Sequence, residues 1–262
     1  MVNCGIQLLL SVEEKTLQGK VILITGGAKR VGGATCRKLH AQGANLMVHY
    51  RASAEAARAL QTELNQVRPG SVALVQGDLL DISKISNLIE ATVKQFGKLD
   101  ALVNNASSFI PTPMGEITEQ AWDDLIGSNF KAPLFLSQAA APHLKKQHGC
   151  IVNIVDIHAE RPLKNYSVYS SAKGGLATLT RSLALELAPE VRVNGISPGP
   201  ILWPEDGEWA DETARQRIIS RTLLKRTGEP DDIARTVLFL IADAPYITGQ
   251  IIAVDGGRSV NL

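Results

Sequence analysis

The sequence is poor in cysteine and lacks the histidine spacing of a metal site. Its 262 residues include three cysteines (Cys4, Cys36 and Cys150), an odd number placed far apart. This usage is typical of reduced thiols in a cytosolic protein and argues against both a disulfide framework and a zinc site. The five histidines show no metal-ligand spacing either. We therefore predict a cytoplasmic protein without a bound metal ion.

The sequence also lacks an excess of charge of one sign and a long apolar run. The formal net charge is +1 and no basic cluster occurs, which excludes an obvious electrostatic footprint for nucleic acid. No apolar run reaches the length of a membrane span. The apolar stretch 5–12 is short, has no basic flank and runs into acidic residues, so we interpret residues 1–18 as an N-terminal tail and not as a signal peptide. We expect neither a nucleic-acid nor a membrane partner.

Short apolar runs rich in β-formers alternate with helical patterns along residues 19–262. Strands are predicted at 20–25, 45–49, 72–75, 99–103, 150–155, 191–196 and 251–254, and the clearest helices at 54–67, 82–96, 118–146, 169–187 and 229–242. The alternation predicts an α/β fold: one Rossmann-like, doubly wound parallel sheet of about seven strands with helices on both faces. No linker or composition break divides this region, so we predict a single domain.

One irregular stretch, residues 198–210, is long and rich in proline, tryptophan and acidic residues. A loop of this length is usually functional or disordered. It follows the sixth predicted strand, and ligands of such folds bind outside the carboxyl ends of the strands. We therefore interpret it as a substrate loop, with Trp203 as its candidate contact residue.

A glycine-rich turn, residues 25–32, joins the first predicted strand to a helix. Glycines there let the backbone approach a pyrophosphate, and the helix N-terminus supplies N–H groups and a positive dipole. Arg30 occupies a place where glycine would often be expected. The turn predicts a dinucleotide site.

The end of the second predicted strand favours NADP(H) over NAD(H). An NAD site usually places an acidic residue about 20 residues beyond the glycines, for the ribose hydroxyls, but no acid occurs from Gly43 to Ala54. Arg51 can instead meet a 2′-phosphate through a bidentate contact, with Lys29 and Arg30 nearby. The alternative is that Arg51 is a solvated loop arginine.

Polar residues also end the third and fourth predicted strands. Asp78 can accept from an adenine amino group or cap the helix that begins near Ile82, and both interpretations stay open. Asn104-Asn105-Ala106 suits close packing against a cofactor, although asparagine also simply makes turns.

Tyr169 and Lys173 lie one turn apart on one face if Tyr169 starts the exposed end of a helix. An ammonium beside a phenol lowers the phenol pKa from its usual value of about 10, so Tyr169 could pass a proton near neutral pH. Asp156 stands thirteen residues earlier, at the end of an apolar run. The alternative is an ordinary surface tyrosine and lysine.

Together these motifs resemble the short-chain dehydrogenase/reductase family over about Gly19 to Val260. The resemblance is carried by Thr25-Gly26, Gly32, Asn104 to Ser107, Asn129, Tyr169, Lys173 and Pro198-Gly199. It implies that Tyr169 transfers the proton, that Lys173 binds the nicotinamide ribose and lowers the tyrosine pKa, and that Asn129 supports a water-mediated proton path. It also implies a homotetramer. The predicted cofactor-binding set is Gly26, Lys29, Arg30, Val31, Gly32, Tyr50, Arg51, Ser53, Asp78, Leu79, Asn105, Ala106, Ser107, Tyr169, Lys173, Pro198 and Gly199.

Two departures from the family pattern resemble its pteridine reductase branch. Arg30 replaces the middle glycine, and Asp156 stands where the catalytic serine belongs. The stretches 28–32, 49–51, 104–113 and 161–163 are similar to that branch as well. We therefore predict an NADPH-dependent reductase that converts a dihydropterin of the dihydrobiopterin, dihydromonapterin or dihydrofolate type to its tetrahydro form.

A pterin is a flat heterocycle, and Phe109 could stack on it opposite the nicotinamide. The alternative is that Phe109 is a core aromatic. The predicted catalytic set is Asp156, Tyr169, Lys173 and Asn129, and the predicted substrate-binding set is Arg30, Ser107, Phe109, Asp156, Tyr169 and Trp203. Two other functions were weighed: a carbonyl reductase of a ketoacyl thioester or sugar ketone, which Asp156 disfavours, and a non-catalytic NADP(H) sensor, which the complete catalytic set disfavours.

Overall fold

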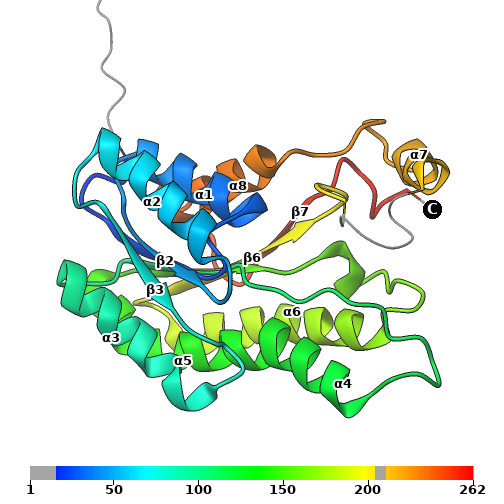
Figure 1. The fold of residues 1–262 in the computed structure, drawn as a ribbon, viewed down its shortest axis with the longest axis horizontal. Coiled ribbons are helices and arrows are strands. Elements are labelled where there is room, and N and C mark those ends of the chain that lie inside the picture. Colours follow the sequence, from blue (N-terminus) through cyan, green and yellow to red (C-terminus); the bar gives the residue numbers. More distant parts are fainter. Residues whose placement is uncertain (1–15, 204–210, 262) are drawn as a thin grey trace, which may run out of the picture.

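The computed structural model describes residues 16–203 and 211–261, so most of the predicted tail and the end of the predicted substrate loop lie outside the described residues. One parallel sheet of seven strands, in the order β3-β2-β1-β4-β5-β6-β7, forms the centre (Figure 1). The strands are β1 Val21–Ile24, β2 Asn45–Tyr50, β3 Val72–Gln76, β4 Ala101–Asn104, β5 Cys150–Ile154, β6 Arg192–Pro198 and β7 Ile251–Val254. The predicted α/β fold is confirmed.

Helices cover both faces of the sheet (Figure 1). One face packs against α1 (Arg30–Ala41), α2 (Ala54–Val67) and α8 (Pro230–Ala242), which share a buried aliphatic cluster with β1, β2 and β5. The other face packs against α3 (Ile85–Phe96), α5 (Ala132–Gln147) and α6 (Ser167–Leu187). Because both faces are covered, the strands are continuously apolar and not alternating, as the sequence indicates.

The strand order reverses between β1 and β4, which lie side by side although two strands separate them in sequence. This is the switch point at which open α/β sheets bind ligands, outside the carboxyl ends of the strands. The glycine turn after β1 and the asparagines at the end of β4 therefore face one another.

The long helix predicted at 118–146 is interrupted. Thr118 caps α4 (Glu119–Ile126) by accepting a hydrogen bond from the Ala121 N–H at 3.1 Å. A π-helical segment, Gly127–Lys131, then separates α4 from α5, so the long helix is interrupted just before Pro133. Such π-helical insertions often occur at functional sites.

Two further expectations differ from the structure. Tyr169 does not start the exposed end of a helix: α6 begins two residues earlier, at Ser167, and the Tyr169 side chain is buried. The helix α7 (Glu212–Ser220) was missed, because it has no buried residue and hence no apolar periodicity. Among the described residues no helix is long and apolar enough to cross a membrane. Within residues 16–203 and 211–261, no group of three or more histidine, cysteine or acidic side chains could hold a metal ion.

Candidate active site

A cavity of about 560 Å³ opens at the carboxyl ends of the strands, at the switch point. It brings together the glycine turn, the ends of β2 to β6 and the first part of the segment after β6. The lining includes these predicted residues: Gly26, Lys29, Arg30, Val31, Gly32, Tyr50, Arg51, Ser53, Asp78, Leu79, Asn105, Ala106, Ser107, Asp156, Tyr169, Pro198 and Gly199. Four other predicted residues, Lys173, Asn129, Phe109 and Trp203, do not line it.

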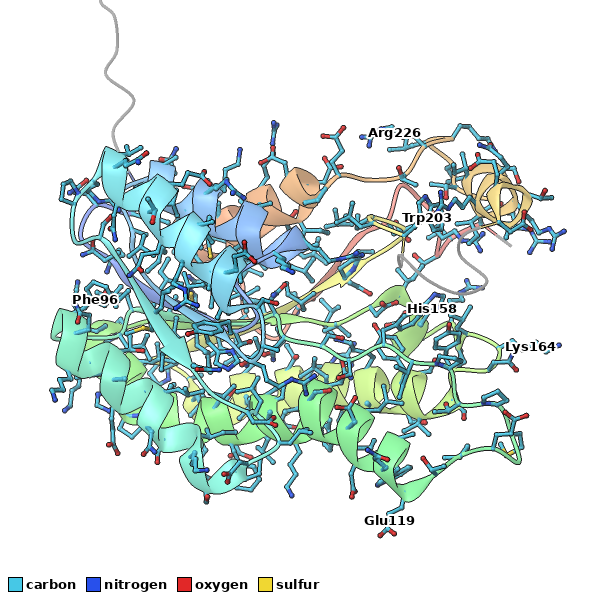
Figure 2. The ribbon with its side chains drawn as sticks, viewed as in Figure 1. Phe96, Glu119, His158, Lys164, Trp203 and Arg226 are labelled. Carbon is cyan, nitrogen blue, oxygen red and sulfur yellow. The ribbon has the colours of Figure 1, made fainter. Side chains whose placement is uncertain are left out.

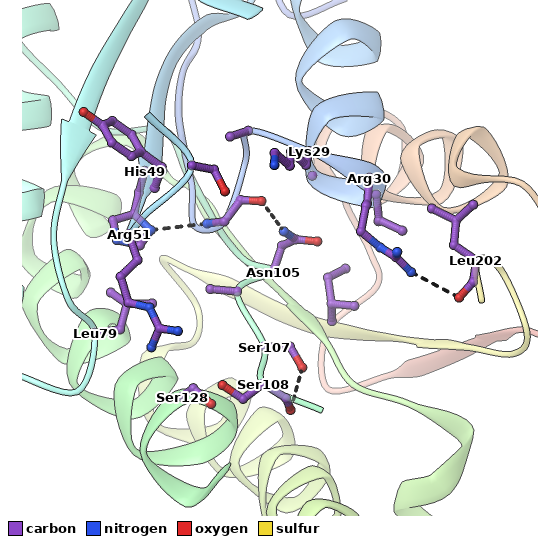
Figure 3. Close-up of a pocket in the computed structure, with 18 of the residues that line it drawn as sticks. Lys29, Arg30, His49, Arg51, Leu79, Asn105, Ser107, Ser108, Ser128 and Leu202 are labelled. Atoms are coloured by element: carbon purple, nitrogen blue, oxygen red, sulfur yellow. Dashed lines mark hydrogen bonds between the residues drawn. The ribbon is translucent and has the colours of Figure 1, made fainter. Parts of the chain in front are cut away.

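The glycine turn forms a cradle in which Gly26 and Gly32 leave no room for a side chain. Gly26 has a φ of +60°, and a Cβ on Gly32 would lie 2.3 Å from the Gly26 carbonyl oxygen. The amide of Asn105 holds the turn by donating to the Thr25 carbonyl at 2.9 Å. It also donates to the Gly26 carbonyl at 3.1 Å (Figure 3). The backbone at the start of α1 is thus open toward the cavity, which fits the phosphates of a dinucleotide.

Arg30 links this turn to the segment after β6. Its backbone φ is +52°, and its guanidinium donates to the carbonyls of Leu202 and Trp203 at 3.2 and 3.3 Å (Figure 3). The sequence prediction assigns Arg30 to both the cofactor-binding and the substrate-binding residues. In this structure it is directed to the segment that would contact substrate.

The residues expected at the adenosine end lie at the cavity wall. Arg51 is more than half exposed, and its nearest acid is Asp124, at 3.7 Å. Asp78 accepts a hydrogen bond from the Leu80 N–H at 3.0 Å within its own loop. It does not cap the helical segment that begins at Ile82, whose N-cap position is Asp81. Because Asp78 also lines the cavity, adenine recognition stays a prediction.

The phenol of Tyr169 donates a hydrogen bond of 2.7 Å to Asp156. The other carboxylate oxygen of Asp156 accepts from the His158 N–H at 2.8 Å, which fixes the acid. Burial, followed by the Asp156 charge, raises the pKa of Tyr169 well above its usual range. The expectation that Lys173 lowers this pKa is therefore wrong for this structure.

Lys173 does not reverse the effect of Asp156 on the Tyr169 pKa. Its ammonium is 5.7 Å from the centre of the Tyr169 ring and donates to the Ile154 carbonyl at 2.8 Å. Burial lowers the pKa of Lys173 to about 8, against the opposing charge of Asp156. The lysine is therefore charged at neutral pH and loses its charge in mildly alkaline solution.

Ser107 also interacts with Tyr169, and Asn129 interacts with Ser107. The Ser107 hydroxyl donates to Asn129 Oδ1 at 2.7 Å, and hydrogen bonding from Ser107 opposes the rise of the Tyr169 pKa. Asn129 is fully buried in the π-helical segment, where its amide donates to the carbonyls of Leu125 and Ser108. Asn129 thus reaches Tyr169 through Ser107, which sequence reasoning did not anticipate.

Phe109 packs beside the cavity and not in its lining. Its ring stacks on Tyr166 with centroids 4.4 Å apart and meets the Tyr169 ring edge-on at 4.8 Å. This is the core-aromatic alternative for Phe109, within a small cluster that includes Leu125 and Val168. A pterin that stacks on Phe109 would have to use the ring face opposite Tyr166.

Trp203 lies on the segment after β6 (Figure 2). The Arg215 guanidinium of α7 is 5.7 Å from its ring. Cavity-lining residues that sequence reasoning missed are Ala28, His49, Ala52, Leu80, Ser108, Ser128, Ile154, Ile201 and Leu202. Of these, the lone histidine in the otherwise apolar run 46–49 was the one visible signal.

Comparison with known proteins shows the family. Residues 9–259 match the family model described as Enoyl-(Acyl carrier protein) reductase. The chain is 38% identical to pteridine reductase 1 of Leishmania tarentolae over 280 residues, which cover 92% of this chain and 96% of that protein. It is 35% identical to a 3-oxoacyl-(acyl-carrier-protein) reductase of Staphylococcus aureus, with 91% and 97% covered. It is 32% identical to 3beta-hydroxysteroid dehydrogenase 1 of Eggerthella lenta, with 93% and 95% covered.

The chain belongs to the short-chain dehydrogenase/reductase family and is an oxidoreductase. Members of this family typically use NAD(P)H, and the glycine cradle fits a dinucleotide. The predicted homotetramer and cytoplasmic location stay predictions.

Proposed function

We propose that the protein is an NADPH-dependent pteridine reductase that converts a dihydropterin to its tetrahydro form. One observation carries the proposal: a carboxylate, Asp156, lies 2.7 Å from the Tyr169 hydroxyl, where the family pattern has a serine. The similarity to pteridine reductase 1 over nearly the whole chain supports it.

The reaction adds a hydride to a ring carbon and a proton to the neighbouring nitrogen. NADPH, when bound, would supply the hydride, to C6 of a 7,8-dihydropterin. The chain supplies the proton, and a carboxyl and a phenol that share a hydrogen bond can hold and pass it. The raised pKa keeps the Tyr169 phenol protonated, so that it has a proton to donate.

The remaining polar residues orient the reactants. We expect the charged ammonium of Lys173, which lies 5.7 Å from the centre of the Tyr169 ring, to bind the nicotinamide ribose. The chain Asn129–Ser107 stabilises the other side of the phenol. Arg51 and the absence of an acid after β2 favour NADPH over NADH.

A carbonyl reductase is the second candidate, because ketoacyl and steroid reductases are also among the similar proteins. The test is NADPH oxidation measured with dihydrobiopterin, dihydromonapterin, dihydrofolate, a ketoacyl thioester and a sugar ketone. We expect kcat/KM to be highest for one of the pterins. Turnover of a ketone alone would contradict the proposal, and turnover of nothing would favour an NADP(H) sensor.

Replacement of Phe109 by alanine should weaken pterin binding about two- to tenfold. An aromatic contact contributes about 0.5–1.5 kcal/mol beyond area burial, and NADPH does not depend on it in this proposal. The measurement is the Kd of each ligand for wild-type and Phe109→Ala protein. Because Phe109 also packs on Tyr166, Phe109→Leu serves as the control that keeps apolar volume. An equal loss of NADPH affinity would make Phe109 a structural residue only.

Activity should decline above about pH 8. Lys173 has a pKa lowered to about 8, so its ammonium is lost as the pH rises through that value, while the raised pKa keeps Tyr169 protonated. The measurement is kcat/KM from about pH 6 to pH 10. In Lys173→Arg the positive charge persists over the whole pH range, because a guanidinium does not lose its proton in it. The pH at which kcat/KM begins to decline should therefore be higher in this variant. If kcat/KM depends on pH in the same way in both proteins, Lys173 is not the group whose deprotonation causes the alkaline decline.

A further inference from the structure

His49 is a buried histidine at the end of β2 that contacts the two loops flanking the adenosine end of the cavity. Its Nδ1 lies 3.2 Å from the Gly26 nitrogen and accepts that N–H. Its Nε2 lies 3.1 Å from the Gly77 carbonyl oxygen. The His49 backbone carbonyl also accepts from the Gly27 N–H, at 3.0 Å. One residue therefore holds two successive N–H groups of the glycine turn.

These contacts assign the protonation state of the ring. Gly26 N–H is a donor, so Nδ1 must carry no proton, and the Gly77 carbonyl is an acceptor, so Nε2 must carry one. Only the neutral Nε2–H tautomer satisfies both bonds. A second proton, on Nδ1, would face the Gly26 N–H and break the bond to the turn. His49 and Asn105 thus hold the turn from two sides (Figure 3).

The surroundings favour the neutral ring. Burial lowers the pKa of His49 below its usual value, and this outweighs the bond to Gly77 and the charge of Asp78 after β3, which both favour protonation. The basic side chains of neighbouring elements, Lys29 and Arg30 on the turn and Arg51 after β2, lie at the same cavity and add no attraction for a proton. The strands β1 and β3 that flank β2 carry no ionisable residue.

We propose that His49 is a positioning residue for the dinucleotide. In its neutral form it fixes the glycine turn in the conformation that binds the phosphates, and its protonation releases the turn and weakens cofactor binding. This rests on the dinucleotide site of the proposed function and not on the pterin. A protein that turns over no pterin would leave it standing.

The test compares the Kd for NADP⁺ of wild-type and His49→Gln protein by calorimetry from about pH 8 to about pH 5. The 2′-phosphate itself titrates near pH 6, so the quantity of interest is the ratio of the two Kd values at each pH, in which ligand titration cancels. At pH 8 the variant should bind about three- to tenfold more weakly, because it loses a hydrogen bond to the turn. The ratio should fall toward one as His49 gains its proton.

His40→Gln is the matched control. His40 is also buried, in the last turn of α1, and its Nε2 lies 2.8 Å from the Ser71 hydroxyl; neither residue lines the cavity. The ratio of the Kd for NADP⁺ of His40→Gln to that of the wild-type protein should not change with pH. A His49→Gln ratio near one at pH 8, or a ratio that is constant down to pH 5, would overturn the proposal.

A second measurement needs no variant. In wild-type protein with ¹⁵N-labelled histidine, NMR should show the Nε2–H tautomer of His49 at neutral pH. Saturating NADP⁺ should lower the His49 pKa, since a ligand that binds the neutral form must disfavour the charged one. The Nδ1–H tautomer, or a pKa that NADP⁺ leaves unchanged, would contradict the proposal even if His49→Gln failed to fold.

Discussion

Turnover should fall by about 10²–10⁴-fold when Asp156 is replaced by alanine, and by a similar factor in Tyr169→Phe. This is the usual size of a general-acid effect, and the two groups share a 2.7 Å hydrogen bond in the cavity. The double variant should lose far less than the product of the two factors, because residues that act as one unit are not additive. The measurement is kcat of all three variants with the best pterin.

Asp156→Ser is the informative control, because it restores the family's serine. It keeps a hydrogen-bonding group near Tyr169 but not a group that can hold a second proton. We expect partial pterin activity, with ketone reduction rising relative to it. NADPH affinity and the thermal unfolding midpoint establish that each variant is folded. Near wild-type turnover in a folded Asp156→Ala protein that binds NADPH would remove Asp156 from the mechanism and, with it, the main local reason to prefer a pterin.

Replacing Arg51 by aspartate should erode the preference for NADPH over NADH by about tenfold to a hundredfold. A charge-assisted bond to a phosphate contributes about 1.5–3 kcal/mol, and each 1.4 kcal/mol is a factor of ten. The Arg51 side chain is mostly exposed, and its ion pair with Asp124 is long, at 3.7 Å. Arg51 can therefore turn toward a 2′-phosphate at little cost. The measurement is the ratio of kcat/KM for the two cofactors.

Two matched variants make the Arg51 result specific. Arg51→Lys keeps the charge but not the bidentate geometry and should show an intermediate preference. Arg58→Asp places the same charge change on the exposed side of α2 and should leave the preference unchanged. Equal efficiency of the wild-type protein with both cofactors would contradict the assignment.

The sheet was predictable because each strand is a short apolar run ended by turn residues. The boundaries of α2 and β7 agree with the sequence prediction at both ends. The helix α7 was not predictable from periodicity, since it buries no side chain. The π-helical segment was not predictable either, because one extra residue per turn has no compositional signature.

The cavity lining followed from the position of residues at strand ends, but the chemistry of Tyr169 did not. Spacing placed Lys173 on the same helix face, which suggested a lowered phenol pKa. The outcome depends on quantities that spacing does not contain: the depth of burial and the 2.7 Å contact with Asp156, which together raise it. His49 was overlooked for a similar reason, because a single histidine in an apolar strand gives no indication of which backbone groups its ring will meet.

The left-handed backbone of Arg30 lowers the stability of the fold locally. A left-handed conformation costs a residue other than glycine about 1–2 kcal/mol, and the family pattern avoids that strain with glycine. Here the strained residue carries the guanidinium that reaches the carbonyls of Leu202 and Trp203. Glycine at this position would relax the turn and sever its tie to the segment after β6. The arginine therefore lowers the stability of the fold locally and in return links the glycine turn to the segment after β6, so that two parts of the cavity lining are held together.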